Sequence, residues 1–237
     1  MVLRLLALGL ALLAPWPDTG QAAELTAGEV RARVAAAGDA PPDLADLDLS
    51  GLDLRGLDFR GANLRASWLK EANLEGADLS GSNLDLAILR NANLKGASLA
   101  GVQAFQAVFS GGDLSGADLS GAEIVAKFER SNLAGANLAG ANLAADMQNQ
   151  SMGLLRAHLT KARLAGANLE GARLGHCTAE FADFAGARLA GADLSLCELA
   201  GADFAGADIS GVDFTGADLR SARLDDALGR AQAIGLE

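Results

Sequence analysis

Residues 61–84 read GANLRASWLKEANLEGADLSGSNL, with a leucine at every fifth position. A small residue precedes each leucine by two positions, and glycine often follows it by two. A period of five fits neither the turn of an α-helix nor the alternation of a β-strand, so it predicts a chain that bends at fixed intervals. These leucines are the expected core centres of a repeating coil: Leu64, Leu69, Leu74, Leu79 and Leu84.

The composition also indicates a repetitive core. The chain has 237 residues, of which 29 are Gly and none is Tyr, and its formal net charge is -11. A core with identical small positions uses Ala, Leu and Gly, whereas a globular domain of this size carries more large aromatic residues. Because binding phosphates requires clustered Lys and Arg, the acidity argues against a nucleic-acid partner.

Tandem copies of the unit A(D/N)LxG resemble the pentapeptide-repeat family. The resemblance implies an all-β solenoid, a right-handed four-sided β-helix in which four pentapeptides form one coil. The pattern predicts this β-helix over residues 43–228, with an irregularity at 144–158 where the regular Ala and Gly are missing. If Met147 and Met152 are degenerate centres, the repeats amount to about nine coils.

The first 22 residues have the pattern of a signal peptide. Arg4 precedes a short apolar run, and small residues follow it before Glu24, which predicts cleavage near Ala22 or Ala23. The run is about half as long as a bilayer requires, so no membrane span is expected after cleavage. The mature chain is then expected in a bacterial periplasm.

Both ends of the solenoid are expected to be covered. Residues 23–42 predict an N-terminal capping helix and linker, because Thr26 and Glu29 form a capping box before a short apolar face. Residues 225–233 are expected to form two helical turns that cover the last coil. Residues 229–237 are assigned to a C-terminal tail.

If four pentapeptides form one coil, residues 20 apart lie above one another. Outward positions then form opposite-charge ladders, which are Arg163 with Asp183, Arg173 with Asp193, Arg188 with Asp208, and Asp203 with Arg223. Exposed ion pairs contribute about 0–1 kcal/mol each, so these ladders are expected to fix register and solubility more than stability.

The two cysteines, Cys177 and Cys197, are also 20 apart and occupy the inward small-residue position. Their Cα atoms are expected about 5 Å apart, which a disulfide can bridge, and export favours oxidation. Side chains stacked in register point the same way, however, which favours two buried thiols. Both interpretations remain open, and no metal, cofactor or catalytic site is predicted anywhere in the chain.

Apolar residues interrupt the otherwise polar outward positions. Trp68, Ile88 and Val108 occur at intervals of 20, so they are expected to stack on one face. The adjoining edge would hold Leu86, Phe105 and Val125. Monomers seldom leave such an apolar patch bare, so either residues 146–156 or a protein partner is expected to cover it.

Two functions are therefore predicted. The first is a non-enzymatic exported scaffold that binds an unknown envelope protein, or a second copy of itself as a homodimer, through a solenoid face. The alternative follows from the family resemblance and is an acidic DNA mimic that binds DNA gyrase or topoisomerase. The leader argues against the mimic, because gyrase is cytoplasmic.

Overall fold

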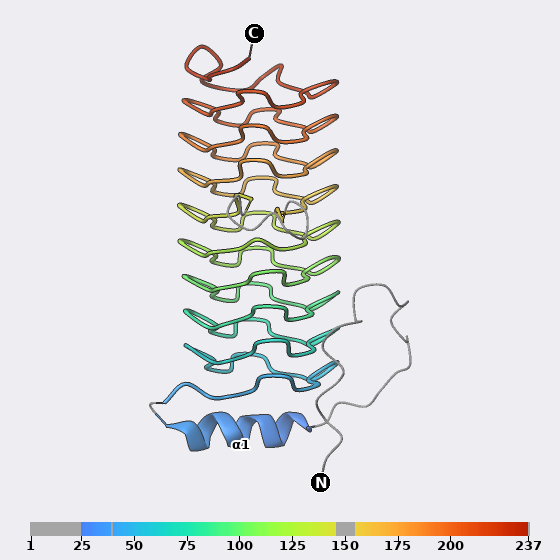
Figure 1. Cartoon of the computed structure of the whole chain (residues 1–237), viewed down its shortest axis with the longest axis vertical. Helices are drawn as coiled ribbons and strands as arrows, with labels where there is room; N and C mark the ends of the chain where they lie inside the picture. Colours follow the sequence, from blue (N-terminus) through green and yellow to red (C-terminus); the bar gives the residue numbers. More distant parts are fainter. Residues whose placement is uncertain (1–24, 39, 146–154, 237) are drawn as a thin grey trace.

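The computed structural model describes residues 25–38, 40–145 and 155–236. Its single α-helix in these ranges is α1 (Ala27–Ala37), which lies across one end of a stack of coils (Figure 1). The expected signal peptide and the centres Met147 and Met152 lie outside the described residues. No helix in the described part of the chain is long and apolar enough to cross a bilayer.

The coils pair through parallel β-bridges, one on each side of the coil, instead of through long strands. We number the four columns of bridges as faces 1 to 4 and name each corner by the faces it joins. Face 1 extends from Asp43 to Ile234, face 2 from Asp48 to Asp218, face 3 from Asp53 to Arg223, and face 4 from Asp58 to Leu228.

Neighbouring coils satisfy one another's backbone groups. Around face 1, for example, the Leu64 N–H donates to the Asn83 carbonyl in the next coil at 2.8 Å, and the Asn63 N–H donates to the Pro42 carbonyl at 3.0 Å. Because the bonds lead both forward and backward along the stack, each coil needs a neighbour on both sides.

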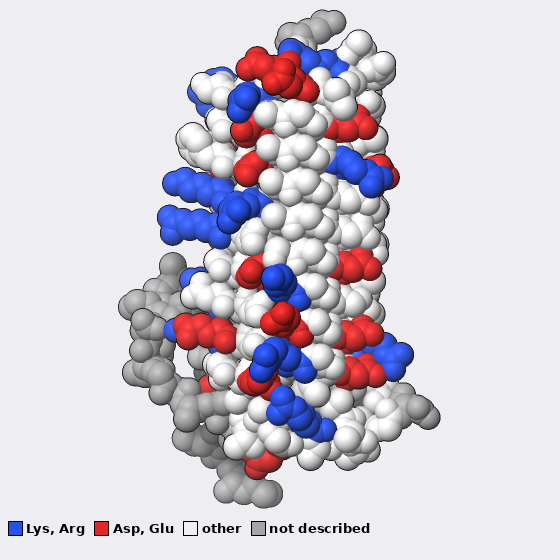
Figure 2. Space-filling model, turned by 180° about the vertical axis from the view of Figure 1, so that it is seen from behind, with Lys and Arg blue, Asp and Glu red and all other residues white. Residues whose placement is uncertain are grey.

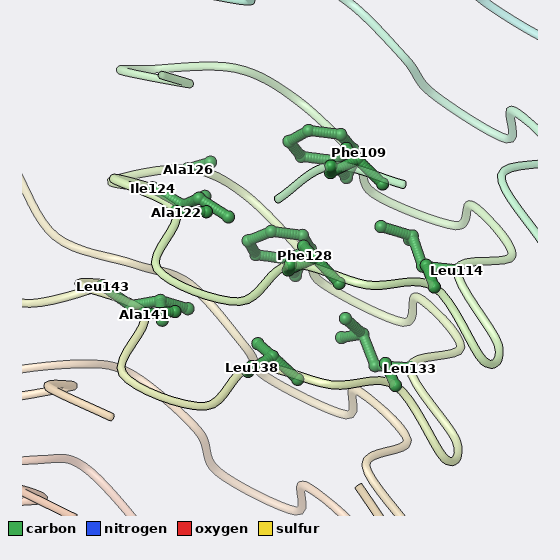
Figure 3. Close-up of a cluster of buried hydrophobic side chains, with 14 of the residues drawn as sticks. Phe109, Leu114, Ala122, Ile124, Ala126, Phe128, Leu133, Leu138, Ala141 and Leu143 are labelled. Atoms are coloured by element: carbon green, nitrogen blue, oxygen red, sulfur yellow. The ribbon is translucent and has the colours of Figure 1, made fainter. Parts of the chain in front are cut away.

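The interior is filled by the repeat centres and the small residues before them, nearly all of which are fully buried. Figure 3 shows Phe109 lying over Phe128 and Leu114 over Leu133. The two phenylalanine rings are parallel, with centroids 4.9 Å apart. Like side chains therefore stack on one another along the axis.

The length of the coil changes at two corners. At corner 1–2 the step between faces is one residue short from Glu123 to Lys127, yet Lys127 still pairs with Val108. In the next coil the same step extends from Asn142 to His158, and His158 pairs with Lys127. At corner 4–1 of the last coil, the step from Leu228 to Ile234 is one residue long, and the pairing on the four faces is maintained throughout.

Helix α1 packs on the first coils. Its capping box is complete, because the Thr26 side chain accepts from the Glu29 N–H at 3.2 Å and Glu29 accepts from the Thr26 N–H at 2.7 Å. Val30 is fully buried in the same apolar cluster as Leu44. Three partly buried leucines of the first coils also pack against this cluster: Leu47, Leu52 and Leu57.

The prediction of helical turns at 225–233 is wrong. This segment forms turns, and pairing continues beyond it, since Leu228 bridges to Asp208 and Ile234 to Asp213. The Ile234 N–H donates to the Val212 carbonyl at 2.8 Å. Backbone pairing with the preceding coil replaces local helical bonds, so 229–237 extends the solenoid as far as Ile234.

A candidate protein-contact face

Face 2 presents an apolar ladder along the axis of the solenoid. Trp68 bridges to Ile88, and Ile88 bridges to Val108. Trp68 is 37% exposed, whereas Ile88 and Val108 are half-buried. Backbone bonds hold the ladder in register, such as the one from the Leu69 N–H to the Ile88 carbonyl at 2.8 Å.

The other predicted patch residues lie beside this ladder at corner 1–2. The Leu86 N–H donates to the Phe105 carbonyl at 2.8 Å, which places these corner residues in adjacent coils. Leu86 is 40% exposed, and Phe105 and Val125 are half-buried. Phe105 and Val125 line an open groove of about 550 Å³ that also includes Asp85 and Arg173.

The corners on either side of face 2 differ from the others. At corners 3–4 and 4–1, the described residues with positive φ are glycines, which adopt this conformation without a Cβ clash. At corners 1–2 and 2–3 many positions carry side chains despite positive φ, a conformation disfavoured for L-residues. These residues are Asp46, Ala66, Leu86, Gln106, His176 and Leu196 at corner 1–2, and Glu71, Asn91, Arg130, Lys161, Phe181 and Ser221 at corner 2–3.

Sequence reasoning missed two exposed apolar residues at these corners. Phe181 at corner 2–3 is 62% exposed, and Leu196 at corner 1–2 is 50% exposed. Each stands two positions after a repeat centre, where glycine is common. The absence of glycine at these two positions could therefore have identified the exposed apolar residues from the sequence.

Most Asp and Asn side chains on the faces bind their own corner. Asp183, for example, accepts from the N–H of Ala185 at 3.0 Å, and Asn142 accepts from the N–H of Ala144 at 3.2 Å. These are Asx turns, in which the carboxylate or amide oxygen satisfies a backbone donor that the bend leaves free. The repeated D/N position thus has a structural function at each bend.

Three of the four predicted charge ladders do not form ion pairs among the described residues. Asp203 and Arg223 pair at 3.4 Å, but Arg188 pairs with Glu170 in place of Asp208. In each of the other three pairs the two residues are nevertheless joined by a parallel bridge, as Arg173 is to Asp193, so the predicted register is present without the ion pair. Arg163 and Arg173 have no ion-pair partner in the described ranges.

The strongest charge perturbations occur near the N-terminal end. The Arg55 side chain donates to Asp53 at 2.9 and 2.8 Å and lowers the pKa of that carboxyl to about 2. Arg60 lowers the pKa of Asp58 to about 2 in the same way. These carboxylates are exposed and remain ionised across the physiological pH range, so they contribute to the acidity of the surface.

Cys177 and Cys197 lie in adjacent coils beneath face 2, with their Sγ atoms 2.7 Å apart as two buried thiols. The Cys197 Sγ also lies 3.1 Å from the Leu174 carbonyl oxygen. Burial raises the pKa of the Cys177 thiol well above its usual value. The Cys177 sulfur is therefore protonated, and burial shields both sulfurs from reagents in the folded chain.

Iodoacetamide is expected to leave both thiols unmodified in the native chain and to add two carbamidomethyl groups after unfolding in denaturant. Burial keeps the reagent away from both sulfurs, and unfolding exposes them. Mass spectrometry of the two samples measures the result. Rapid labelling of the native chain would contradict this prediction, and labelling of the unfolded chain only after reduction would reveal a disulfide.

The histidines are at separate positions. The Nδ1 atom of His158 on face 2 lies 3.0 Å from the Thr178 Oγ1, and burial lowers the pKa of this imidazole. His176 is at corner 1–2. In the described ranges, no three His, Cys, Asp or Glu side chains converge in a way that could hold a metal ion.

Comparisons with known proteins agree with this architecture. The family model for pentapeptide repeats matches in 8 copies, over residues 43–85, 67–103, 87–124, 157–195, 182–220 and 197–227. A search of curated protein sequences found no significant match.

Among solved structures, the chain is similar to HetL, a pentapeptide repeat protein involved in heterocyst differentiation regulation from the cyanobacterium Nostoc sp. strain PCC 7120. The two are 32% identical over 87% of this chain and 98% of HetL, with a TM-score of 0.50. Full-length QnrB1, a plasmid-mediated fluoroquinolone resistance protein, is 22% identical over 71% of this chain and 89% of its own, with a TM-score of 0.36. The repeat matches and the similarity to HetL show that this chain belongs to the pentapeptide repeat family and has its right-handed β-helix fold.

Proposed function

We propose that this chain is a non-enzymatic, exported scaffold that binds a partner protein through face 2 and its two flanking corners. The observation that carries the proposal is the position of its exposed large apolar residues. Apart from Leu228 and Ile234 near the C-terminal end, those described lie on face 2 or its corners: Trp68, Leu86, Phe181 and Leu196.

The backbone conformation at these corners also supports face 2 as the contact surface. Residues in the left-handed region are disfavoured by about 1–2 kcal/mol relative to the right-handed conformation when they carry a Cβ. Strain of this kind is often retained where side chains serve a function. Corners 3–4 and 4–1 use glycine at such positions, so the side chains around face 2 fit a role in contact.

A scaffold fits the interior better than an enzyme does. The repeat centres fill the core, and the grooves on the described surface are open. Catalytic sites usually enclose their substrate and bring titratable groups together within a cleft. Open grooves along a rod are suited to contacts with another macromolecule.

The alternative of a DNA mimic has less support. Such a surface needs carboxylates in rows that stand in for phosphates, whereas many Asp side chains here bind the backbone of their own turn, as Asp208 and Asp213 do. Arg173 and Arg188 also interrupt the acidic columns. Export, which remains a proposal, would separate the chain from cytoplasmic gyrase.

Site-specific photocrosslinking in cells tests the scaffold function. A photoreactive amino acid at Leu86 is expected to give a discrete protein adduct in the periplasmic fraction, whereas the same group at Ser115 on corner 3–4 gives none. The variant Leu86→Ser should lose partner capture but unfold at nearly the same denaturant concentration as the parent, because Leu86 is an exposed corner residue.

The matched control is Leu228→Ser, which removes an equally large exposed side chain from face 4. It should leave capture unchanged. An uncleaved cytoplasmic chain would contradict export, and equal adducts from positions 86 and 115 would contradict the assignment of the face. An adduct with a second copy of the chain would identify self-association through this face.

A further inference from the structure

A cluster of cations borders the apolar ladder at corner 2–3. Arg90, Lys127, Arg130 and Lys161 line an open groove of about 510 Å³, and we call these four residues the basic edge. Lys127 and Arg130 share one coil and Lys161 lies in the next, with the Arg130 N–H donating to the Thr160 carbonyl at 3.1 Å, whereas the coil of Ser110 separates Arg90 from them. Figure 2 likewise shows Lys and Arg side chains projecting together from one edge of the solenoid, whereas many other charges alternate in sign.

The basic edge is not neutralised by the described part of the chain. None of its four cations forms an ion pair with a described residue, although the chain as a whole carries a net charge of -11. The single carboxylate that lines the groove, Glu129, accepts a hydrogen bond from the Ser110 hydroxyl at 2.5 Å. Four cations therefore face solvent beside one engaged carboxylate.

The basic edge and the apolar ladder form one continuous surface. Lys127 bridges directly to Val108, so it continues the ladder along face 2. Arg90 stands two residues after Ile88 and turns the chain into corner 2–3. A partner that lies along the axis would therefore contact apolar side chains and cations side by side.

We infer that the segment of the partner bound here is an acidic amphipathic helix. Its apolar stripe lies on Trp68, Ile88 and Val108, and carboxylates along one flank of the helix meet the basic edge. This inference rests on the proposed function, since it assigns the chemistry of the partner at the same face.

The spacing of the ladder matches a helix. Paired coils are about 4.8 Å apart, so the three ladder residues repeat at that distance. The apolar residues along one face of an α-helix recur every three or four positions, which is a rise of about 5 Å. The two repeats stay in phase over the three coils of the ladder, and Glu residues farther along the same helix then reach Arg130 and Lys161 in the next two coils.

Electrostatics favour a short acidic segment over an extended polyanion. Charges separated by more than about 8 Å are largely screened at physiological salt, so a helix with a few carboxylates experiences mainly the basic edge. Duplex DNA or an anionic membrane would also face the carboxylates elsewhere on a chain of net charge -11. Repulsion by these groups opposes binding of either surface.

The probe is a fluorescein-labelled synthetic helix of about 18 residues, with leucine at every third or fourth position and glutamate along one flank. Fluorescence anisotropy measures its binding to the chain at about 50 mM and about 300 mM salt. The test variant is Arg130→Glu with Lys161→Glu. The matched control, Lys95→Glu with Arg230→Glu, makes the same change in net charge at exposed positions away from face 2 and its corners.

Reversing the charges of Arg130 and Lys161 is expected to raise the Kd of the probe about tenfold or more, whereas the control variant changes the Kd less than about threefold. High salt should weaken binding to the parent chain, and a probe with lysine in place of glutamate should not bind. Equal effects of the two double variants, no binding of the acidic probe, or tighter binding of duplex DNA or anionic vesicles would overturn the inference. If Leu86→Ser abolishes capture in cells but the charge reversal changes nothing, the contact face stands and only its acidic partner is rejected.

Discussion

Replacing Phe204 by alanine is expected to destabilise the folded chain by about 3–5 kcal/mol. Phe204 is fully buried, and its ring stacks on Phe184 with centroids 4.9 Å apart and meets the edge of Phe214 at 5.7 Å. Removing the ring leaves a cavity between coils that cannot collapse, because backbone pairing fixes their separation. Chemical denaturation followed by circular dichroism measures the loss.

The matched control is Phe181→Ala, which removes the same ring from an exposed corner. Phe181 is 62% exposed; its ring lies over Gly201, and the Lys161 Nζ is 6.0 Å from the ring centre. Its loss is expected to change the free energy of unfolding by about 1 kcal/mol or less. Equal losses for the two variants would contradict a core held together by stacked centres.

Replacing Val30 by aspartate is expected to detach α1 from the first coils. Val30 is fully buried against the solenoid, and a carboxylate placed there has no cation to pair with inside an apolar cluster. Undocking the helix avoids burying the charge, so the loss is limited to the free energy of docking. Leu47, Leu52 and Leu57 would then become more exposed at the uncovered end.

Limited trypsin digestion measures this detachment. Cleavage after Arg31 and Arg33 should accelerate about tenfold or more, because proteolysis follows the population of the open helix. Ala32→Asp is the control: it adds the same charge to the same helix at an exposed position. Similar cleavage of the two variants would show that Val30 does not hold α1.

The sequence was sufficient to predict the repeat and its core. A leucine at every fifth position predicts which side chains fill the interior, because each centre must point inward for the coils to close. The separation of 20 then places Trp68 over Ile88, since the winding is almost uniform in that part of the chain. In a sequence with such a regular repeat, the residues that contact one another between coils can be predicted from their separation along the chain.

The properties of the corners and ends were harder to predict. Glycine is absent two positions after the centres at Phe181 and Leu196, but the consequence depends on which corners those positions occupy. The stacking of the four predicted charge ladders is confirmed, but only Asp203 and Arg223 form an ion pair, because a long exposed Arg side chain can adopt many conformations. The segment at 225–233 forms turns because pairing by Ile234 overrides a helical preference.

Two of the three length changes fall at corner 1–2, which makes this corner a natural insertion point for engineering. The step there is one residue shorter between Glu123 and Lys127 and much longer between Asn142 and His158, and the faces still pair. Foreign peptides grafted between residues 145 and 155 should therefore be displayed at the side of the rod without shifting the frame of later coils. The same tolerance offers evolution a way to diversify binding specificity while the scaffold remains constant.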